Sequence, residues 1–304
     1  MMKKLTLSWD GIQDSTGYMF SFAKALCCAV KNSPYNALAE EIIASSGFAF
    51  RMWISQTLCP SATSIWTYST QKTGVENGGL SCSYIERLWG QDDIDEQRRR
   101  SAITAIQHSI DSGIAAISWD IGVCEWGLIT GYDDQTQKFA TLSVTGSTEE
   151  LDYALLGKRE IPILNVLTIT GKTNRTQKEI FAGTLRIAKN HLLGKEPCEN
   201  VQGLAVYSSL IKHFENENHN AADSWNMEYF LGTYAPLKQY AWLFFEKYRK
   251  RELAEKYKTV YKCWQDAFDI KRTSGRLTEN SRKTILTLLK EAEKQEKQAV
   301  SIMI

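Results

Sequence analysis

The sequence predicts a mixed α and β protein of the α+β class, with helices and then an antiparallel sheet in its N-terminal half and only helices afterwards. Short segments rich in β-branched residues occur between residues 114 and 169, helical apolar spacing precedes them, and helical patterns fill the chain from residue 176. A chain of 304 residues is long enough for two domains. We expect these to be residues 1–172 and residues 173–304.

The first predicted element is a buried helix over residues 15–30, where apolar side chains fall on nearly every face. Asp14 or Ser15 is placed to be its N-cap, and Pro34 stops it. Further helices are predicted over residues 36–44 and 101–112. The charges of residues 92–100 alternate in sign, which indicates a solvated loop and a helix start.

Gly113 ends this helical region and four strand-like segments follow. Each is short, rich in β-branched residues and bounded by turn residues such as Asp133 and Asp134, so together they predict one antiparallel sheet. The segments are residues 114–119, 126–132, 138–144 and 163–169.

The C-terminal half begins with a helix over residues 176–192. Thr176 and Glu179 have the spacing of a capping box, and Gly194 is the stop signal. Further helices are predicted at about residues 203–215, 223–249, 251–268 and 278–300.

Charge and hydropathy exclude two classes of partner. Lys plus Arg total 36 and Asp plus Glu total 35, so no net field attracts nucleic acid or an anionic membrane surface. No apolar run reaches the length of a signal peptide or a membrane span. We therefore expect a cytoplasmic protein without nucleic-acid or membrane partners.

The cysteine pattern predicts no disulfide framework and no zinc site. Seven cysteines form no CxxC pair and have no accompanying histidine spacing. Most should be buried thiols, although Cys124 is also a candidate site residue because it adjoins Glu125 at the edge of a predicted strand. We expect neither a metal nor a cofactor.

Three blocks carry a family resemblance: Trp-Asp-Gly-Ile-Gln-Asp-Ser at residues 9–15, Ser-Gly-Phe-Ala-Phe-Arg at 46–51 and Glu-Trp-Gly-Leu-Ile-Thr-Gly-Tyr-Asp-Asp at 125–134. Together they resemble the butirosin-biosynthesis protein H N-terminal family, itself related to papain-like and bacteriocin-leader peptidases. The resemblance covers about residues 5–215 in spaced blocks. It implies a papain-like domain over residues 1–172 and acyl transfer or amide cleavage as its chemistry.

In that family a cysteine at a helix start is the nucleophile, and the resemblance matches it with Ser15. The base station, often a histidine, corresponds to Glu125, while the place of the orienting Asp offers only Thr141 or Ser143. A serine hydroxyl needs a base that takes its proton before it becomes a useful nucleophile. The resemblance therefore implies a degenerate catalytic site.

Other residues are candidates for binding, each with a structural alternative. Asp14 and Ser15 can be helix caps, Glu125 can form an ion pair with Arg51, and Asp133 can serve a turn. His108 is interpreted as a surface or capping histidine. The binding candidates are Asp14, Arg51, Trp53, Cys124, Trp126 and Asp133, and an aromatic-lined pocket is a further hypothesis for Trp9, Trp53, Trp66, Trp89, Trp119 and Trp126.

Two functions remain open. The first is an acyltransferase or hydrolase that uses Ser15 and Glu125 on a small-molecule, acyl or peptidyl substrate, free or bound to a carrier protein. The second is a catalytically inactive module that keeps the fold and binds a ligand or a protein. A homodimer is compatible with either.

Overall fold

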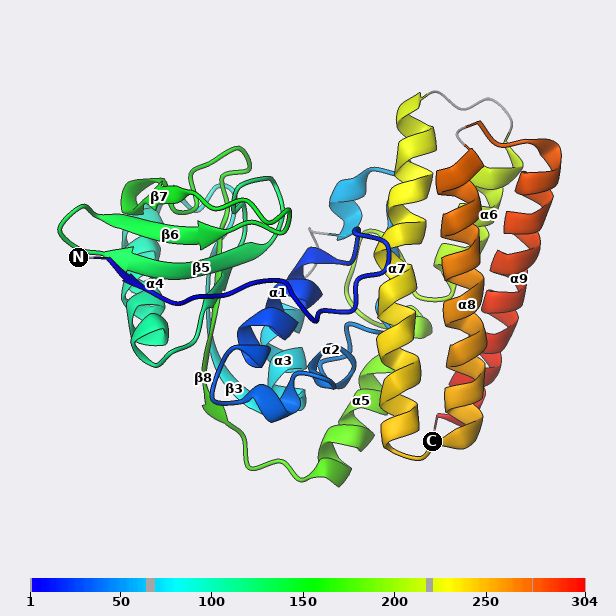
Figure 1. Ribbon diagram of the computed structural model, residues 1–304, viewed down its shortest axis with the longest axis horizontal. Helices are drawn as coiled ribbons and strands as arrows, with labels where there is room; N and C mark the ends of the chain where they lie inside the picture. The colour runs from blue at the N-terminus through cyan, green and yellow to red at the C-terminus, as the bar shows by residue number, and fades with distance from the viewer. Residues whose placement is uncertain (1, 64–68, 217–220, 275, 304) are drawn as a thin grey trace. The chain divides into compact units, whose positions relative to one another are not determined.

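The computed structural model describes residues 2–63, 69–216, 221–274 and 276–303. The chain divides into two compact units, each built from separate segments (Figure 1). The first unit contains Met1–Ile12, Ser21–Ile42 and Gln71–Thr176, and the second contains Gln13–Phe20, Ile43–Thr70 and Gln177–Ile304. The break at residues 176–177 lies near the expected boundary at 172–173, whereas two segments that we expected in the first domain belong to the second unit.

The first unit is built on a seven-stranded antiparallel sheet (Figure 1). All four predicted strands are present. The strand over Leu80–Arg87 was not predicted, although apolar and polar residues alternate from Leu80 to Tyr84, because frequent Ser, Thr and Gly over residues 59–100 obscured this pattern. The strand order is β3 (Leu80–Arg87), β8 (Leu164–Lys172), β4 (Ala116–Ser118), β5 (Gly127–Asp133), β6 (Lys138–Leu142) and β7 (Glu150–Asp152), with β1 (Lys3–Lys4) paired to β5.

One face of this sheet is covered by α4 (Asp95–Asp111). Its buried side chains pack in one cluster with side chains of β5, β6, β7 and β8, among them Ile129 and Val166. The helix begins at Asp95 and not at residue 101, so the helix start predicted for residues 92–100 lies near the beginning of that run. Arg99 is 7% exposed and forms an ion pair with Asp95, one helical turn earlier, at 2.8 Å. Charged residues of this run are therefore part of the helix and pair within it.

The opposite face carries α1 (Ser21–Lys31). Side chains alternate along a strand, so Trp126 and Leu128 point away from the α4 cluster that contains Ile129. Phe22 of α1 meets the Trp126 ring edge-on at 5.2 Å. Both faces of the sheet are therefore buried.

Smaller elements complete the N-terminal half. The helix predicted over residues 36–44 is instead η1 (Asn36–Leu38) followed by α2 (Ile42–Ser45), because a turn closed by the Ala39 N–H on Asn36 intervenes. The others are η2 (Pro60–Thr63), α3 (Ser69–Asn77), η3 (Asp92–Ile94) and η4 (Tyr153–Leu155).

The second unit is mainly helical, as predicted for the C-terminal half. It also contains a two-stranded antiparallel sheet of β2 (Trp53–Ile54) and β9 (Val201–Gln202). No helix in the described part of the chain is long and apolar enough to cross a membrane. The helices are α5 (Gln177–Leu192), α6 (Ala205–Glu215), α7 (Ala221–Lys247), α8 (Arg251–Ser274) and α9 (Glu279–Ile302).

The core of this helical unit contains an ion pair that is fully buried. Lys238 of α7 and Glu296 of α9 lie 2.7 Å apart, and both side chains are 0% exposed. Tyr207 of α6 donates its hydroxyl to the second Glu296 oxygen at 2.9 Å and accepts the indole N–H of Trp264. Burial lowers the pKa of Lys238, and the Glu296 charge opposes that effect. A buried pair of this kind is costly to break because one charge is left alone.

We predict that Glu296→Gln lowers the free energy of unfolding by about 3 kcal/mol, because it leaves the Lys238 ammonium buried without a counter-charge. The measurement is urea unfolding followed by circular dichroism. The amide still accepts from Tyr207, so the double variant Lys238→Met with Glu296→Gln should recover more than half of the loss. A double variant as unstable as the sum of the two single variants would contradict this account.

Candidate functional site

Ser15 does not start a helix, which corrects the N-cap prediction. The segment Gln13–Phe20 lies in the second unit, and the Ser15 hydroxyl donates to Gln265 of α8 at 2.7 Å. Asp14 accepts the backbone N–H groups of Gly17 and Met19 at 2.9 and 3.2 Å. Gly17 has φ +79°, a left-handed conformation that interrupts a helix. Asp14 therefore stabilises the turn before α1.

The serine at the start of the buried helix is Ser21. Its hydroxyl donates to the Glu125 carboxylate at 2.5 Å and accepts the backbone N–H of Trp126 at 3.3 Å. Ser21 is 5% exposed. The structure thus pairs Glu125 with the Ser21 hydroxyl, whereas the predicted partner, Ser15, bonds to Gln265.

The loop between β4 and β5 holds Glu125 in place. The Glu125 N–H donates to the carbonyl of Val123 at 2.6 Å, and the Glu125 carbonyl accepts from Ile121. Asp120 begins the loop with φ +59°, and its carboxylate accepts the N–H of Ile161 at 3.1 Å. These hydrogen bonds fix the backbone of the loop and thereby the direction of the Glu125 side chain.

Cys124 has the properties of an unreactive thiol. Burial and then the neighbouring Glu160 and Asp120 carboxylates raise its pKa to about 12. A thiol in that state carries almost no thiolate at neutral pH, and the thiolate is the nucleophile. The packing alternative for Cys124 is therefore the better one.

Aromatic side chains surround the Ser21–Glu125 pair on the α1 side of the sheet. The Trp126 ring lies 5.5 Å from that of Trp119, and both are at least 97% buried. Trp53 belongs to the core of the second unit, Trp89 is 53% exposed, and Trp66 lies outside the described residues. The indoles thus do not line one common pocket.

Arg51 has a different partner from the one predicted. Its guanidinium binds the carboxylate of Glu196 with three contacts of 2.7 to 3.2 Å, and it also donates to the carbonyl of Ser46. The predicted ion pair with Glu125 is therefore wrong. Arg51 is 2% exposed and supports the core of the second unit.

A histidine that the sequence did not single out completes this cluster. His191 is fully buried, accepts the Met52 N–H at Nε2 over 2.7 Å and lies 2.9 Å from Glu196 through Nδ1. Burial lowers the pKa of His191, so it is neutral and donates its Nδ1 proton to Glu196. The edge of the Trp53 ring packs on the imidazole at 5.1 Å. This cluster braces β2 against α5.

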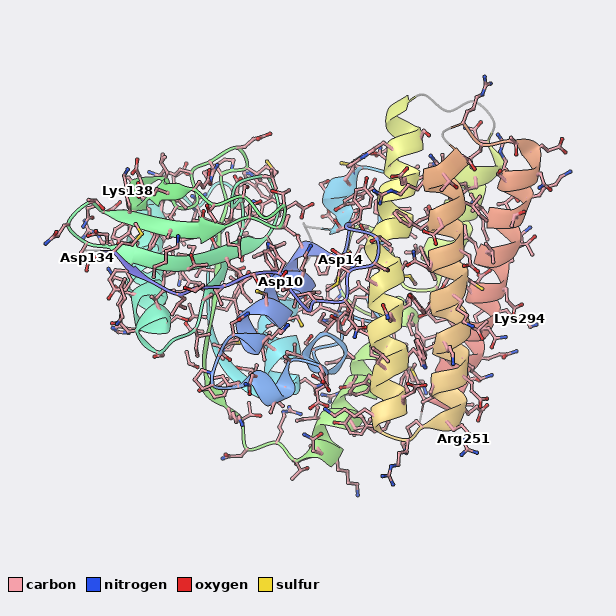
Figure 2. All side chains as sticks on the ribbon, in the orientation of Figure 1. Asp10, Asp14, Asp134, Lys138, Arg251 and Lys294 are labelled. Carbon is pink, nitrogen blue, oxygen red and sulfur yellow. The ribbon has the colours of Figure 1, made fainter. Side chains whose placement is uncertain are left out.

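The Asp133–Asp134 pair serves the hairpin between β5 and β6, where Asp134 and Lys138 lie (Figure 2). Asp133 accepts the N–H of Gln135, and Asp134 accepts from Gln107 and Tyr153. No group of three or more His, Cys, Asp or Glu side chains in the described residues could hold a metal ion. Turn formation accounts for Asp133.

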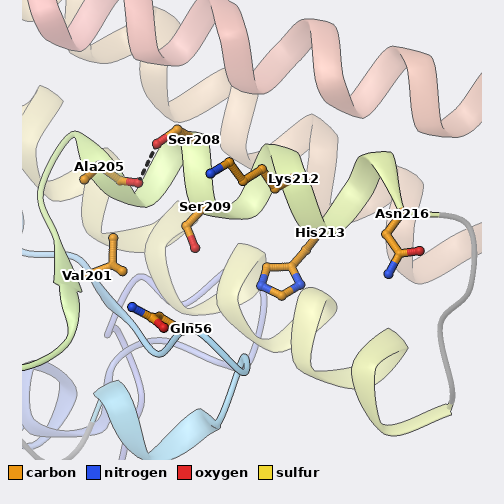
Figure 3. Close-up of a pocket in the computed structure, with 8 residues that line it drawn as sticks. All are labelled: Gln56, Val201, Ala205, Ser208, Ser209, Lys212, His213 and Asn216. Carbon is orange, nitrogen blue, oxygen red and sulfur yellow. Dashed lines mark hydrogen bonds between the residues drawn. The ribbon is translucent and has the colours of Figure 1, made fainter.

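A cavity of about 530 Å³ in the second unit lies along the polar side of α6 (Figure 3). Ser209, Lys212 and His213 face it from the helix, and Gln56 faces it from a loop. Lys212 stands in the last turn, where a cation complements the helix dipole. None of the predicted site residues lines this cavity.

Ser21 was not predicted at the helix start because the predicted helix begins six residues earlier, at Ser15. A signal was present: Gly17 two residues after Ser15 weakens a helix there, and Ser21 is the next residue with N-cap chemistry. His191 was missed because nothing in its neighbourhood has a motif spacing. Its partner Met52 is far away in the sequence and acts through the backbone.

The Glu196 cluster predicts a pH dependence of stability. Burial alone raises the pKa of Glu196, but the His191 hydrogen bond and the Arg51 charge outweigh it and bring the pKa from 4.5 to about 2. The folded state thus binds the proton more weakly, and the contribution, about 3 kcal/mol, is present above pH 4.5 and lost as the pH falls toward 2.

We expect the difference in unfolding free energy between the wild type and Glu196→Gln to shrink as the pH falls from 6 to about 3, measured by urea unfolding. Glu252→Gln is the matched control, because Glu252 is 69% exposed. A difference that does not change with pH would refute the assignment.

The comparisons with known proteins name no family for this chain: no protein-family model matches the sequence, and no curated protein matches it significantly.

Proposed function

We propose that this chain is a cytoplasmic protein of papain-like fold, related to the acyltransferases and amide hydrolases of natural-product metabolism, in which Ser21 and Glu125 form the nucleophile and base. The observation that carries the proposal is the 2.5 Å hydrogen bond from the Ser21 hydroxyl to the Glu125 carboxylate. A nucleophile and a base within hydrogen-bond reach are what covalent acyl transfer requires.

The position of Ser21 supports the same chemistry. Ser21 is the first residue of α1, and the first backbone N–H groups of a helix have no partner within the helix. Together with the helix dipole they can stabilise a negatively charged oxygen. An acyl group on Ser21 would place its carbonyl oxygen near this helix end.

The reaction would proceed in two balanced steps. As the Ser21 oxygen bonds to the acyl carbon, Glu125 takes the hydroxyl proton, and that proton then passes to the leaving group as its bond to the acyl carbon breaks. Water or an acceptor hydroxyl or amine next attacks the Ser21 ester, giving its proton to Glu125, and the ester oxygen regains a proton from it. The substrate class is a small-molecule, acyl or peptidyl group, free or on a carrier protein.

A glutamate at the position of the base, where the family often has a histidine, determines the rate of acyl transfer that we expect. In model peptides a glutamate carboxylate is about two pKa units weaker as a base than an imidazole, which is worth up to about 100-fold in proton transfer. Turnover should therefore be slow, and an acyl-enzyme should accumulate long enough to be weighed.

The test is to incubate the protein with an activated acyl thioester and to measure its intact mass. We expect one acyl group on the wild type and none on Ser21→Ala, since the Ser21 hydroxyl donates to the base. Glu125→Gln should slow labelling about 100-fold, because an amide cannot accept the proton.

Ser15→Ala is the matched control, and it should label like the wild type because its hydroxyl binds Gln265. Circular dichroism melts check that every variant folds. Labelling that persists in Ser21→Ala, or a wild type that stays unlabelled, would refute the proposal.

The second candidate function is a catalytically inactive module that binds a ligand or a protein. It is favoured by a specific observation: Ser21 is only 5% exposed, and its hydroxyl already both donates to Glu125 and accepts from Trp126. In that case the hydrogen bond between Ser21 and Glu125 holds the β4–β5 loop against α1. Ser21→Ala should then lower the unfolding free energy by about 1 to 3 kcal/mol, because it leaves a carboxylate oxygen without its donor.

A further inference from the structure

We propose that the first unit contains a binding site for a small uncharged ligand rich in hydroxyl groups, in a cavity of about 410 Å³ between the end of α4 and strands β3 and β8. We call this cavity the α4 pocket. Its volume lies in the range of small-molecule sites. The proposal is independent of Ser21 and Glu125, neither of which lines it.

The α4 pocket lies where the covered face of the sheet changes character. On that face Val166 of β8 and Ile85 of β3 pack in the apolar cluster under α4. Thr168 lies two residues after Val166, and Ser83 lies two residues before Ile85 on the antiparallel neighbour strand. Thr168 and Ser83 are therefore on the same face and are paired directly across the two strands. Hydroxyl groups thus replace apolar side chains just where the sheet passes the end of α4.

Thr168 is the strongest indication of a ligand. It is 2% exposed, and its hydroxyl has no hydrogen-bond partner among the described residues. The oxygen is not sealed in the core, because Thr168 lines the α4 pocket and its hydroxyl can bond to a molecule there. Because Thr168 and Ser83 both line the α4 pocket, a bound molecule can supply the missing hydrogen bonds.

The rest of the lining fits a neutral, hydroxyl-bearing molecule. Ser109 and Ser112 already donate to backbone carbonyls, which leaves the Thr168 and Ser83 hydroxyls available. His108 and Tyr35 add an imidazole, a phenol and an aromatic face. Hydroxyl side chains both donate and accept, as the hydroxyl groups of a polyol do.

The charge of the lining excludes ionic ligands. None of the described residues around the α4 pocket is Lys, Arg, Asp or Glu. A charged ligand would lose its hydration there without gaining an opposite charge, and that loss is costly. Lys172 lies over the Tyr35 ring at 5.8 Å but does not line the pocket. We therefore assign the site to an uncharged polyol of about monosaccharide size.

The experiment titrates the full chain with glucose and with myo-inositol and follows backbone amide chemical shifts by NMR. We expect shifts of amides in β3, β8 and the end of α4, with a dissociation constant of about 10 mM or below for at least one of the two. Thr168→Val keeps the shape of the side chain and removes the hydroxyl. It should weaken binding at least about fivefold, the effect of one hydrogen bond, and leave the melting temperature unchanged or raised.

Thr130→Val is the matched control on the same sheet. Thr130 is 3% exposed, donates its hydroxyl to Ala140 at 3.2 Å and does not line the pocket. This variant should melt earlier and bind as the wild type does. Absence of binding by both polyols, tighter binding of glucuronate than of glucose, or full affinity in Thr168→Val would each overturn the proposal.

Discussion

Burial of both faces of the antiparallel sheet is the constraint on which the first unit depends. Side chains alternate along each strand, so the central strands β4 and β5 supply one set to the α4 cluster and another to α1. Ile129 and Trp126 illustrate the two sets on neighbouring parts of the chain. The same alternation sets what lies at the end of α4. It brings Thr168, two residues after Val166, to the α4 pocket, whereas the loop before β5 brings Glu125 to Ser21.

The second unit depends on buried charged side chains that are paired with side chains of opposite charge. Two buried ion pairs show this: Lys238 with Glu296, and Arg51 with Glu196. In each pair the charges lose contact with water, but they lie next to an opposite charge and the carboxylate accepts a further hydrogen bond. Such pairs add little to stability compared with apolar packing, but they penalise any arrangement that separates the partners. They therefore define which helices and strands of this unit meet.

Much of the fold could be predicted from the sequence. The α+β class, the four strands between residues 114 and 169 and the C-terminal helices follow from local periodicity and turn residues, which need no distant partner. The start of the first helix could not, because Asp14 and Gly17 form a turn whose residues bond to α7 and α8. Of the candidate site, the predicted partner of Glu125 was Ser15, and the structure gives Glu125 the Ser21 hydroxyl instead.

The sequence by itself determined that a glutamate, Glu125, precedes a strand, but it placed the serine of the helix start at Ser15 instead of Ser21. Tertiary structure alone decided the partners: Ser21 with Glu125, Arg51 with Glu196, and Thr168 with the lining of the α4 pocket. The reason is physical. Periodicity reports which face of an element is apolar, whereas the partner of a polar group depends on where distant segments meet, and the cost of leaving it unpaired is settled only after folding.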